Sequence, residues 1–192
     1  MRGDPTDREL VERFVGGDDT AFTGLVRRHE RRVYNLAYRM LGREEDARDA
    51  AQDAFLNALR KLSSFRGDAA FTTWLHRVTV NTCYDILRKR KREPVLDMVP
   101  PSAEAGRAPH DHAEGVAASV DVQHALLQVP EEFRAALVLH DVQDLAYEDV
   151  AATLGVPVGT VKSRIHRGRI ALAKALGEHP GTVRPSEERT PQ

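Results

Sequence analysis

The chain has little of what marks several protein classes. Its 192 residues include one cysteine, Cys83, which excludes an internal disulfide framework and a cysteine zinc cage. No apolar run approaches the ~20 residues needed to cross a bilayer, and the first five residues lack the apolar core of a signal peptide. We therefore expect a cytoplasmic protein with no membrane insertion.

Net charge is also nearly absent. The 28 Lys and Arg are balanced by 29 Asp and Glu, giving −1, which at first argues against a nucleic-acid binder. The balance is a cancellation between segments: residues 1–94 carry +4, 95–118 carry −3, 119–157 carry −6, and 158–174 carry +5 with no acid. The two basic segments can therefore still hold a nucleic-acid surface.

Two segments lack the apolar periodicity of a packed domain. Residues 95–118 contain three prolines and two glycines and are predicted to be a flexible linker, and the polar residues 178–192 to be a frayed tail. The remaining segments, 1–94 and 119–177, show apolar stripes at helical spacing, with Gly42 placed to end the first long helix. The sequence predicts an all-α fold of two small helical domains joined by a flexible linker.

The most informative local pattern lies in the second domain. Val150, Ala151 and Leu154 form the inner face of a short helix, and Gly155 permits a sharp turn into a second helix. We expect that helix to begin near Thr160, whose hydroxyl can cap its exposed amides. This spacing predicts a helix-turn-helix.

The second helix of this pair has the surface of a recognition helix. Apolar residues at helical spacing seat it, and basic or hydrogen-bonding residues cover the rest: Lys162, Ser163, Arg164, His166, Arg167 and Arg169. Such a surface suits a DNA groove and its phosphates. An ordinary helical hairpin with a solvated basic face is the alternative that the pattern leaves open.

A second basic run ends the third helix of the first domain. Residues 88–92 are five consecutive cations, downstream of the aromatic residues Phe65, Phe71 and Trp74. Rings beside cations suit unstacked bases and their phosphates. The alternatives are a solvated helix end that complements the helix dipole, and core packing of the rings.

No catalytic constellation is visible. Five acidic residues precede and line the second helix, with no partnering nucleophile or metal-ligand spacing: Glu44, Glu45, Asp46, Asp49 and Asp53. We expect a solvated or protein-binding face. His110-Asp111-His112 is a weak metal candidate within the linker. The sequence therefore predicts no enzyme, no cofactor, no metal site and no small-molecule substrate.

At this point the residues carry a family resemblance. The string DARDAAQDAFLNALRKLSSFRGDAAFTTWLHRVTVNTCYDILRKRKR (46–92), then VPEEFR (129–134) and GTVKSRIHRGR (159–169), resembles the extracytoplasmic-function (ECF) sigma factors of bacterial RNA polymerase. Two departures are small: Val129 stands where the family usually has Leu, and Ala51 where Val or Ile is common. The resemblance covers the chain from about Asp7 to Leu176.

The resemblance implies partners and residue roles. The partners are core RNA polymerase, promoter DNA and an anti-sigma factor. The first domain (1–94) would be sigma region 2, which melts and reads the −10 element through Ser64, Phe65, Phe71, Trp74, Arg77, Asn81, Arg88 and Arg90. It would dock on core polymerase through Asp49, Gln52 and Asp53. The second domain (119–177) would be sigma region 4, which reads the −35 element through Thr160, Lys162, Ser163, Arg164, His166 and Arg167.

Two alternatives share part of this evidence. A stand-alone helix-turn-helix transcription regulator explains the DNA-binding half, but not the aromatic loop, Asn81 and the basic run in one domain. A protein-binding adaptor made of two helical bundles predicts no promoter-dependent transcription. Binding to core polymerase without DNA separates the sigma factor from the regulator.

Overall fold

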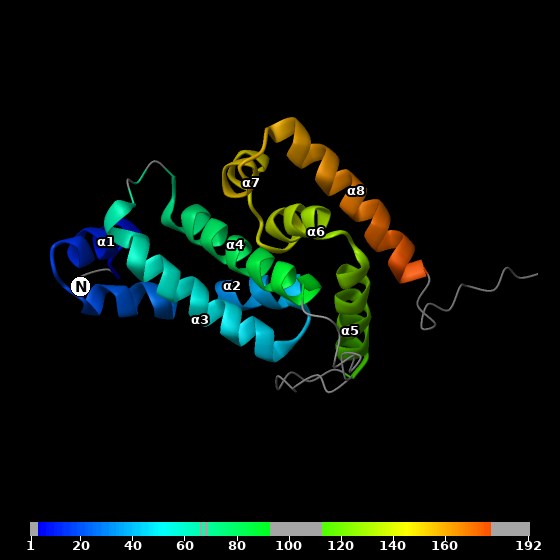
Figure 1. Ribbon diagram of the computed structural model, residues 1–192, viewed down its shortest axis with the longest axis horizontal. Coiled ribbons are helices and arrows are strands. Elements are labelled where there is room, and N and C mark those ends of the chain that lie inside the picture. The colour runs from blue at the N-terminus through cyan, green and yellow to red at the C-terminus, as the bar shows by residue number, and fades with distance from the viewer. Residues whose placement is uncertain (1–3, 66, 68, 93–112, 178–192) are drawn as a thin grey trace, which may run out of the picture.

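The computed structural model describes residues 4–65, 67, 69–92 and 113–177, without the side chains of Ser64 and residues 113–120. Every regular element in this part of the chain is helical, so the predicted all-α fold is confirmed (Figure 1). In chain order the elements are α1 (Asp7–Val15), α2 (Thr20–Leu41), α3 (Glu44–Lys61), the 3-10 turn η1 (Leu62–Ser64), α4 (Phe71–Arg92), α5 (Ala113–Gln128), α6 (Glu131–Leu137), the π-helical turn η2 (Val138–Val142), α7 (Tyr147–Leu154) and α8 (Val158–Gly177).

The helices α1–α4 form the N-terminal bundle. The side chain of Thr6 accepts from the amide of Glu9 and the Glu9 side chain accepts from the amide of Thr6, a capping box that starts α1. Gly42 ends α2 in the left-handed region at φ 82°, as its place after the apolar stripe predicts. The stripes of α2, α3 and α4 meet in the bundle interior, where Leu25 and Leu75 are fully buried or nearly so.

The helices α5–α8 form the C-terminal bundle. Helix α5 begins at Ala113, inside the segment 95–118 predicted as linker, because the helix-favouring alanines 113, 117 and 118 follow its last proline. Gly168 lets α8 approach α6 closely, since a Cβ there would lie 3.2 Å from the carbonyl oxygen of Phe133. Residues 93–112 and the predicted tail, 178–192, lie outside the described part.

The two bundles share one apolar core, a contact that the sequence patterns do not predict. Figure 1 shows α6 and α7 beside α4, with α5 at the far end of the same bundle. A single cluster of buried residues includes Leu36, Met40, Val80, Leu139, Val150 and Ile165, which come from both bundles. The described chain is therefore closed, with its two halves in direct contact.

Polar side chains join the bundles around this core. Arg134 on α6, only 6% exposed, donates from Nη1 to the carbonyl of Met40 at 2.5 Å, and also to the carbonyls of Leu127 and Val129. The side-chain amide of Gln123 donates to the carbonyl of Tyr38 at 3.0 Å. The Arg134 guanidinium thereby satisfies carbonyls at the ends of α2 and α5, which have no partner within their own helices.

Further contacts run along α4. The Nζ of Lys91 lies 3.0 Å from a carboxylate oxygen of Glu131 on α6. The hydroxyl of Thr73 donates to the carboxylate of Asp149 on α7 at 3.4 Å. In this closed state the C-terminal bundle covers one side of α4 from its first turn to its last.

Buried His76 makes the stability of the fold depend on pH. Burial lowers the pKa of His76 to about 4, with the nearby His29 and Arg32 acting in the same direction. The unfolded chain binds a proton near pH 6.5 that folded His76 refuses, so stability falls as pH drops from about 6.5 towards 4. We expect a loss of about 2 kcal/mol between pH 7 and pH 5 from His76 alone.

Urea unfolding at pH 7, 6 and 5 measures this slope. His76→Leu, which has no group to protonate at this position, should make the pH dependence shallower. An equal slope in wild type and His76→Leu would assign the effect to other groups.

Candidate nucleic-acid interface

The three aromatic residues predicted for the −10 site lie together where η1 leads into α4. Ring centroids of Phe65 and Phe71 are 5.9 Å apart in an edge-on arrangement, and those of Phe65 and Trp74 are 5.3 Å apart. Phe71 is buried in the core, and the other two rings are half-buried against it. Phe71 therefore packs in the core, whereas Phe65 and Trp74 keep part of their surface exposed.

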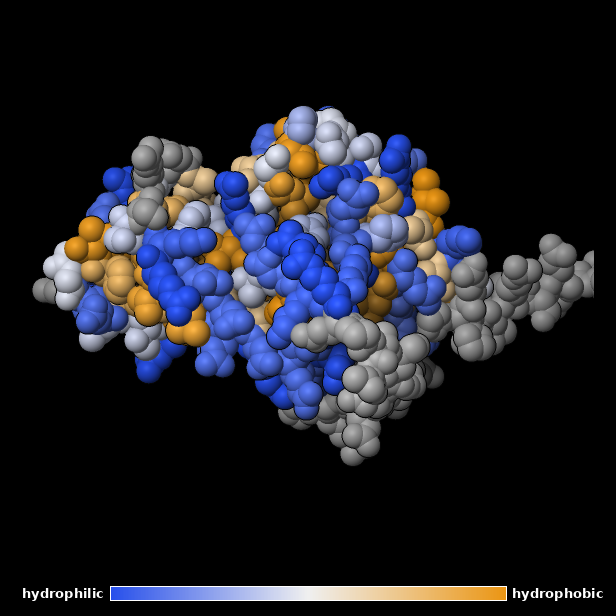
Figure 2. Space-filling view, in the orientation of Figure 1, coloured by the Kyte–Doolittle hydropathy of each residue, from blue (hydrophilic) through white to orange (hydrophobic). Residues whose placement is uncertain are grey.

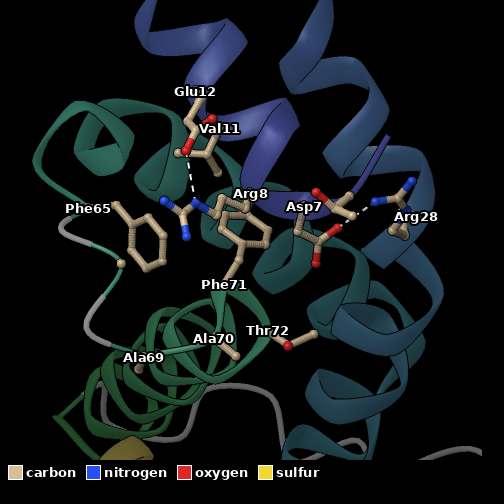
Figure 3. Close-up of a pocket in the computed structure, with 12 residues that line it drawn as sticks. Asp7, Arg8, Val11, Glu12, Arg28, Phe65, Ala69, Ala70, Phe71 and Thr72 are labelled. Atoms are coloured by element: carbon tan, nitrogen blue, oxygen red, sulfur yellow. Dashed lines mark hydrogen bonds and ion pairs between the residues drawn. The ribbon is translucent and has the colours of Figure 1, made fainter. Parts of the chain in front are cut away.

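A pocket of about 870 Å³ opens beside these rings (Figure 3). Phe65, Gly67, Ala69 and Ala70 form one wall, and Phe71 and Thr72 form its base at the start of α4. Its opposite wall comes from α1 and α2: Thr6, Asp7, Arg8, Val11, Glu12 and Arg28. The apolar rings with polar groups around the rim suit a planar ligand that has a hydrogen-bonding edge.

Sequence reasoning missed the α1 wall. Asp7 accepts from Arg28 Nη1 at 2.7 Å, and its second oxygen lies 2.9 Å from Nε2 of the buried His29. Burial lowers the pKa of His29, against the opposing pull of Asp7. These partners lie 21 and 22 residues from Asp7, so no local pattern reveals them. The buried stripe Leu10 and Val11 is the one signal that could have predicted α1.

The rest of the predicted −10 set lies in three places. Arg77, Asn81 and Arg88 are exposed and lie three, seven and fourteen residues after Trp74, along one face of α4. Arg90 lies on another side of the helix and forms an ion pair with Asp46 of α3. Ser64 belongs to η1, but its side chain is outside the described ones.

The predicted polymerase-binding residues share one exposed face of α3. Asp49, Gln52 and Asp53 are exposed, and the two carboxylates have no ion-pair partner among the described residues. Leu56 and Leu59 extend this face and are 42% and 38% exposed, so apolar area lies next to the acidic groups. Figure 2 shows apolar side chains among hydrophilic ones along this part of the molecule.

The other acidic residues of the predicted rim are neutralised within the bundle. Glu44 forms an ion pair with Arg48 at 2.6 Å, and Asp46 forms ion pairs with Arg43 and Arg90. The acidic surface of α3 is therefore narrower than its sequence indicates.

Helices α7 and α8 form the predicted helix-turn-helix. Gly155 takes the left-handed conformation at φ 66°, and α8 begins at Val158, directly after Pro157. The expectation that Thr160 caps α8 is wrong, because Thr160 lies within the first turn and its amide donates to the carbonyl of Pro157 at 2.9 Å. Pro157 pre-sets the backbone for the start of a helix, so α8 begins two residues earlier.

The predicted −35 residues are placed on α8 as follows. Lys162, Ser163, His166 and Arg167 are exposed on its outer side, with the Arg167 guanidinium 6.0 Å from the centre of the Phe133 ring. Arg164 and Thr160 are half-buried, and Arg164 is paired with Glu132 at 3.1 Å. The four exposed residues share a surface, and the other two lie at its edge.

The described residues form neither a membrane-spanning helix nor a cluster of metal ligands. No helix in the described ranges is long and apolar enough to cross a membrane. No three metal-ligating side chains gather among residues 4–65, 67, 69–92 and 113–177, and the candidate His110-Asp111-His112 lies outside these ranges. Buried Cys83, whose pKa burial raises to about 12, is an inert core residue.

Comparison with known proteins places these features in one class. The chain matches the family described as sigma-70 region 2 over residues 25–93 and the family described as sigma-70 region 4 over residues 119–172. These two regions, in this order, define a DNA-binding transcription initiation factor of the sigma-70 class.

Similarity to individual proteins is closer still. The chain is 45% identical over 178 residues to the ECF RNA polymerase sigma factor SigM of Mycobacterium tuberculosis, covering 92% of this chain and 87% of that protein. It therefore belongs to the ECF family of RNA polymerase sigma factors, which bind RNA polymerase and promoter DNA. The expected family is confirmed, and the stand-alone regulator is not favoured.

Solved structures support the same assignment. The chain resembles CnrH in its complex with the cytosolic domain of CnrY, with a TM-score of 0.68 at 27% identity, covering 89% of this chain and 97% of that one. It also resembles the sigma factor RpoE of Bartonella quintana in its complex with the anti-sigma factor NepR, with a TM-score of 0.66 at 28% identity, covering 82% and 97%.

Proposed function

We propose that this ECF sigma factor reads promoters through two separate surfaces. The pocket beside Phe65 and Phe71 takes a base extruded from the −10 region of the non-template strand, and the exposed face of α4 binds the strand that follows. The outer side of α8 enters the major groove at the −35 element. In this arrangement residues 1–94 and 119–177 act as separate units joined by the segment 95–118.

The pocket is the observation that carries the −10 assignment. Extruding a base costs a few kcal/mol, and stacking on an aromatic ring contributes ~1–3 kcal/mol per base. Phe65 offers a half-buried ring at the pocket, Trp74 packs against that ring, and Asn81 offers an amide farther along α4. Arg77 and Arg88 supply positive charge on the same face of the helix for the phosphates, with Arg88 also paired with Asp85.

Arg167 is the residue we assign to a guanine of the −35 element. It is exposed on α8, and its forked donors match O6 and N7 of guanine. Arg167→Ala should weaken binding to −35 duplex DNA by about 1–3 kcal/mol and relax base preference at one position. Fluorescence anisotropy with single-base variants of the duplex measures both effects.

Arg169 provides a matched control on the same helix. It is also exposed, but its guanidinium makes two hydrogen bonds to Asp141, at 2.7 and 3.0 Å. Arg169→Ala should leave base preference unchanged. Equal preference profiles for wild type and Arg167→Ala would remove Arg167 from base recognition.

The exposed face of α3 is the surface we propose for core polymerase. Asp49 and Asp53 supply acidic groups that no described residue pairs with, and Leu56 supplies apolar area between them and the helix end. An acidic and apolar surface suits a basic protein partner and repels DNA phosphates. The DNA-binding and polymerase-binding residues thus lie on different helices of one bundle.

The closed chain must open to read both promoter elements at once. The elements are centred about 25 base pairs apart, or about 85 Å at ~3.4 Å per base pair, whereas the two bundles share a core. The similar solved structures are complexes with NepR or CnrY. We propose that an anti-sigma factor holds this chain in a closed, inactive state within the cytoplasm.

Run-off transcription with purified core polymerase tests the function directly. The template is the promoter upstream of this gene, and the expected product is a transcript that requires the sigma chain. A pull-down without DNA should recover core polymerase, which a stand-alone regulator would not bind. Failure to form an open complex on any genomic fragment would overturn the proposal, and an adaptor or enzyme role would then be reconsidered.

A further inference from the structure

Helix α1 is a fixed part of the pocket, although it precedes the region 25–93 that matches the family. Its first residue, Asp7, is held by Arg28 and His29 of α2. Leu10 and Val11 are 4% and 7% exposed against the bundle. The capping box at its start and the buried stripe along its inner side therefore hold α1 in place against the bundle. The positions of its outward side chains are fixed with it.

Arg8 is an outward side chain of α1 that lines the pocket. Its side chain is 87% exposed, and its Nε donates to Glu12 at 2.9 Å. Figure 3 shows its guanidinium between the rings of Phe65 and Phe71 in this view, and all three residues line the pocket. Its two Nη groups have no partner within the described residues.

The other arginine that lines the pocket in the described part is already engaged. Arg28 donates from Nη1 to Asp7 at 2.7 Å and from Nη2 to the carbonyl of Pro5 at 2.6 Å. Arg8 therefore offers the unpaired guanidinium nitrogens at this opening. Glu12 holds only the Nε side, which leaves the fork of Nη groups directed away from the helix.

We propose that Arg8 binds the phosphate beside the extruded base and thereby positions the −10 strand. An uncharged base can enter among the rings, but its phosphate must remain at the solvent-exposed opening. A planar guanidinium with two free donors is a good ligand for such a phosphate. This inference rests on the proposed base capture. It adds Arg8 to the −10 contacts, although Arg8 precedes the region 25–93 that matches the family.

The test compares Arg8 variants in holoenzyme bound to a fork-junction −10 DNA, taken from a promoter that the wild-type holoenzyme transcribes. Arg8→Ala should weaken binding about three- to tenfold at low salt and reduce the slope of log K against log salt by about 0.7. Arg8→Lys, which keeps the charge, should restore most of the affinity. Because Arg8 is exposed, the Tm of the two variants should not differ from that of the wild type.

Arg13 is the matched control, since it is also an exposed arginine of α1 paired with a carboxylate, Asp18, but it does not line this pocket. Arg13→Ala should bind as wild type does. A second probe carries an uncharged methylphosphonate at the phosphate next to the extruded base. On that probe wild type and Arg8→Ala should bind equally.

The outcomes separate the two claims. If Arg8→Ala matches wild type in affinity and salt slope, or if its loss persists on the methylphosphonate probe, the phosphate contact is wrong and base capture stands. Base capture itself is tested by removing the extruded base from the probe. If wild type binds that abasic probe as tightly as the intact one, the pocket assignment fails independently of Arg8.

Discussion

Gly42→Ala should destabilise the closed chain by about 2–5 kcal/mol. Gly42 has φ 82°, a conformation that costs an L-residue about 1–2 kcal/mol. A Cβ there would also lie 2.3 Å from Cδ1 of Leu127 on α5, and such overpacking costs about 1–3 kcal/mol. The first penalty belongs to the N-terminal bundle alone, whereas the second exists only while the bundles touch.

Gly155→Ala is the matched control for backbone strain. Gly155 has φ 66°, but no atom lies within 4 Å of its added Cβ. In urea unfolding, the free energy of unfolding of Gly155→Ala should fall by the backbone penalty alone. Leu127→Ala combined with Gly42→Ala should recover the packing penalty, giving a coupling energy of about 1–3 kcal/mol.

Opening of the chain gives a second readout. Because separation of the bundles relieves the clash with Leu127, Gly42→Ala should increase the radius of gyration in X-ray scattering and Gly155→Ala should not. Equal destabilisation by the two substitutions, with no change in radius, would show that Leu127 does not press on position 42.

Arg134→Met should lower the free energy of unfolding by about 2–4 kcal/mol. The substitution leaves the carbonyls of Met40, Leu127 and Val129 buried without their donor, and hydrogen bonds to charged groups contribute ~1.5–3 kcal/mol each. Burial of the guanidinium, which lowers the pKa of Arg134, opposes part of this gain. Methionine keeps most of the buried volume, so a cavity is not the cause of the loss.

Thermal and urea unfolding measure this effect. Arg169→Met is the control, because that arginine is exposed and its pair with Asp141 should contribute less than about 1 kcal/mol. Arg134→Lys retains the charge but not the fork, and should fall between wild type and Arg134→Met. Wild-type stability in Arg134→Met would mean that water satisfies these carbonyls equally well.

Local patterns predicted the helices and much of the site. The apolar stripe up to Leu41 followed by Gly42, and the Ala151 to Gly155 spacing of the helix-turn-helix, each correspond to an observed element. These features depend on residues within a few turns of one another. The grouping of Phe65, Phe71 and Trp74 was predictable for the same reason.

Long-range contacts were not predictable. The Asp7 carboxylate binds side chains more than 20 residues away, and Arg134 binds backbone carbonyls, which leave no signature in the sequence. The ion pair that draws Arg90 towards Asp46 likewise depends on how α3 and α4 pack. Local signals could have improved the sequence prediction at two places, Leu10 and Val11 for helix α1 and Pro157 for the start of α8.

Ion pairs within the protein affect its non-specific binding to chromosomal DNA. Glu131, Glu132 and Asp141 hold Lys91, Arg164 and Arg169, so part of the basic surface already has counterions supplied by the protein itself. DNA affinity grows with each phosphate that a free cation neutralises, and a genome offers on the order of 10⁶–10⁹ non-specific sites. We expect this pairing to lower the non-specific affinity of the chain for the genome, and separation of the bundles to free only Lys91, because the other two pairs lie within the C-terminal bundle.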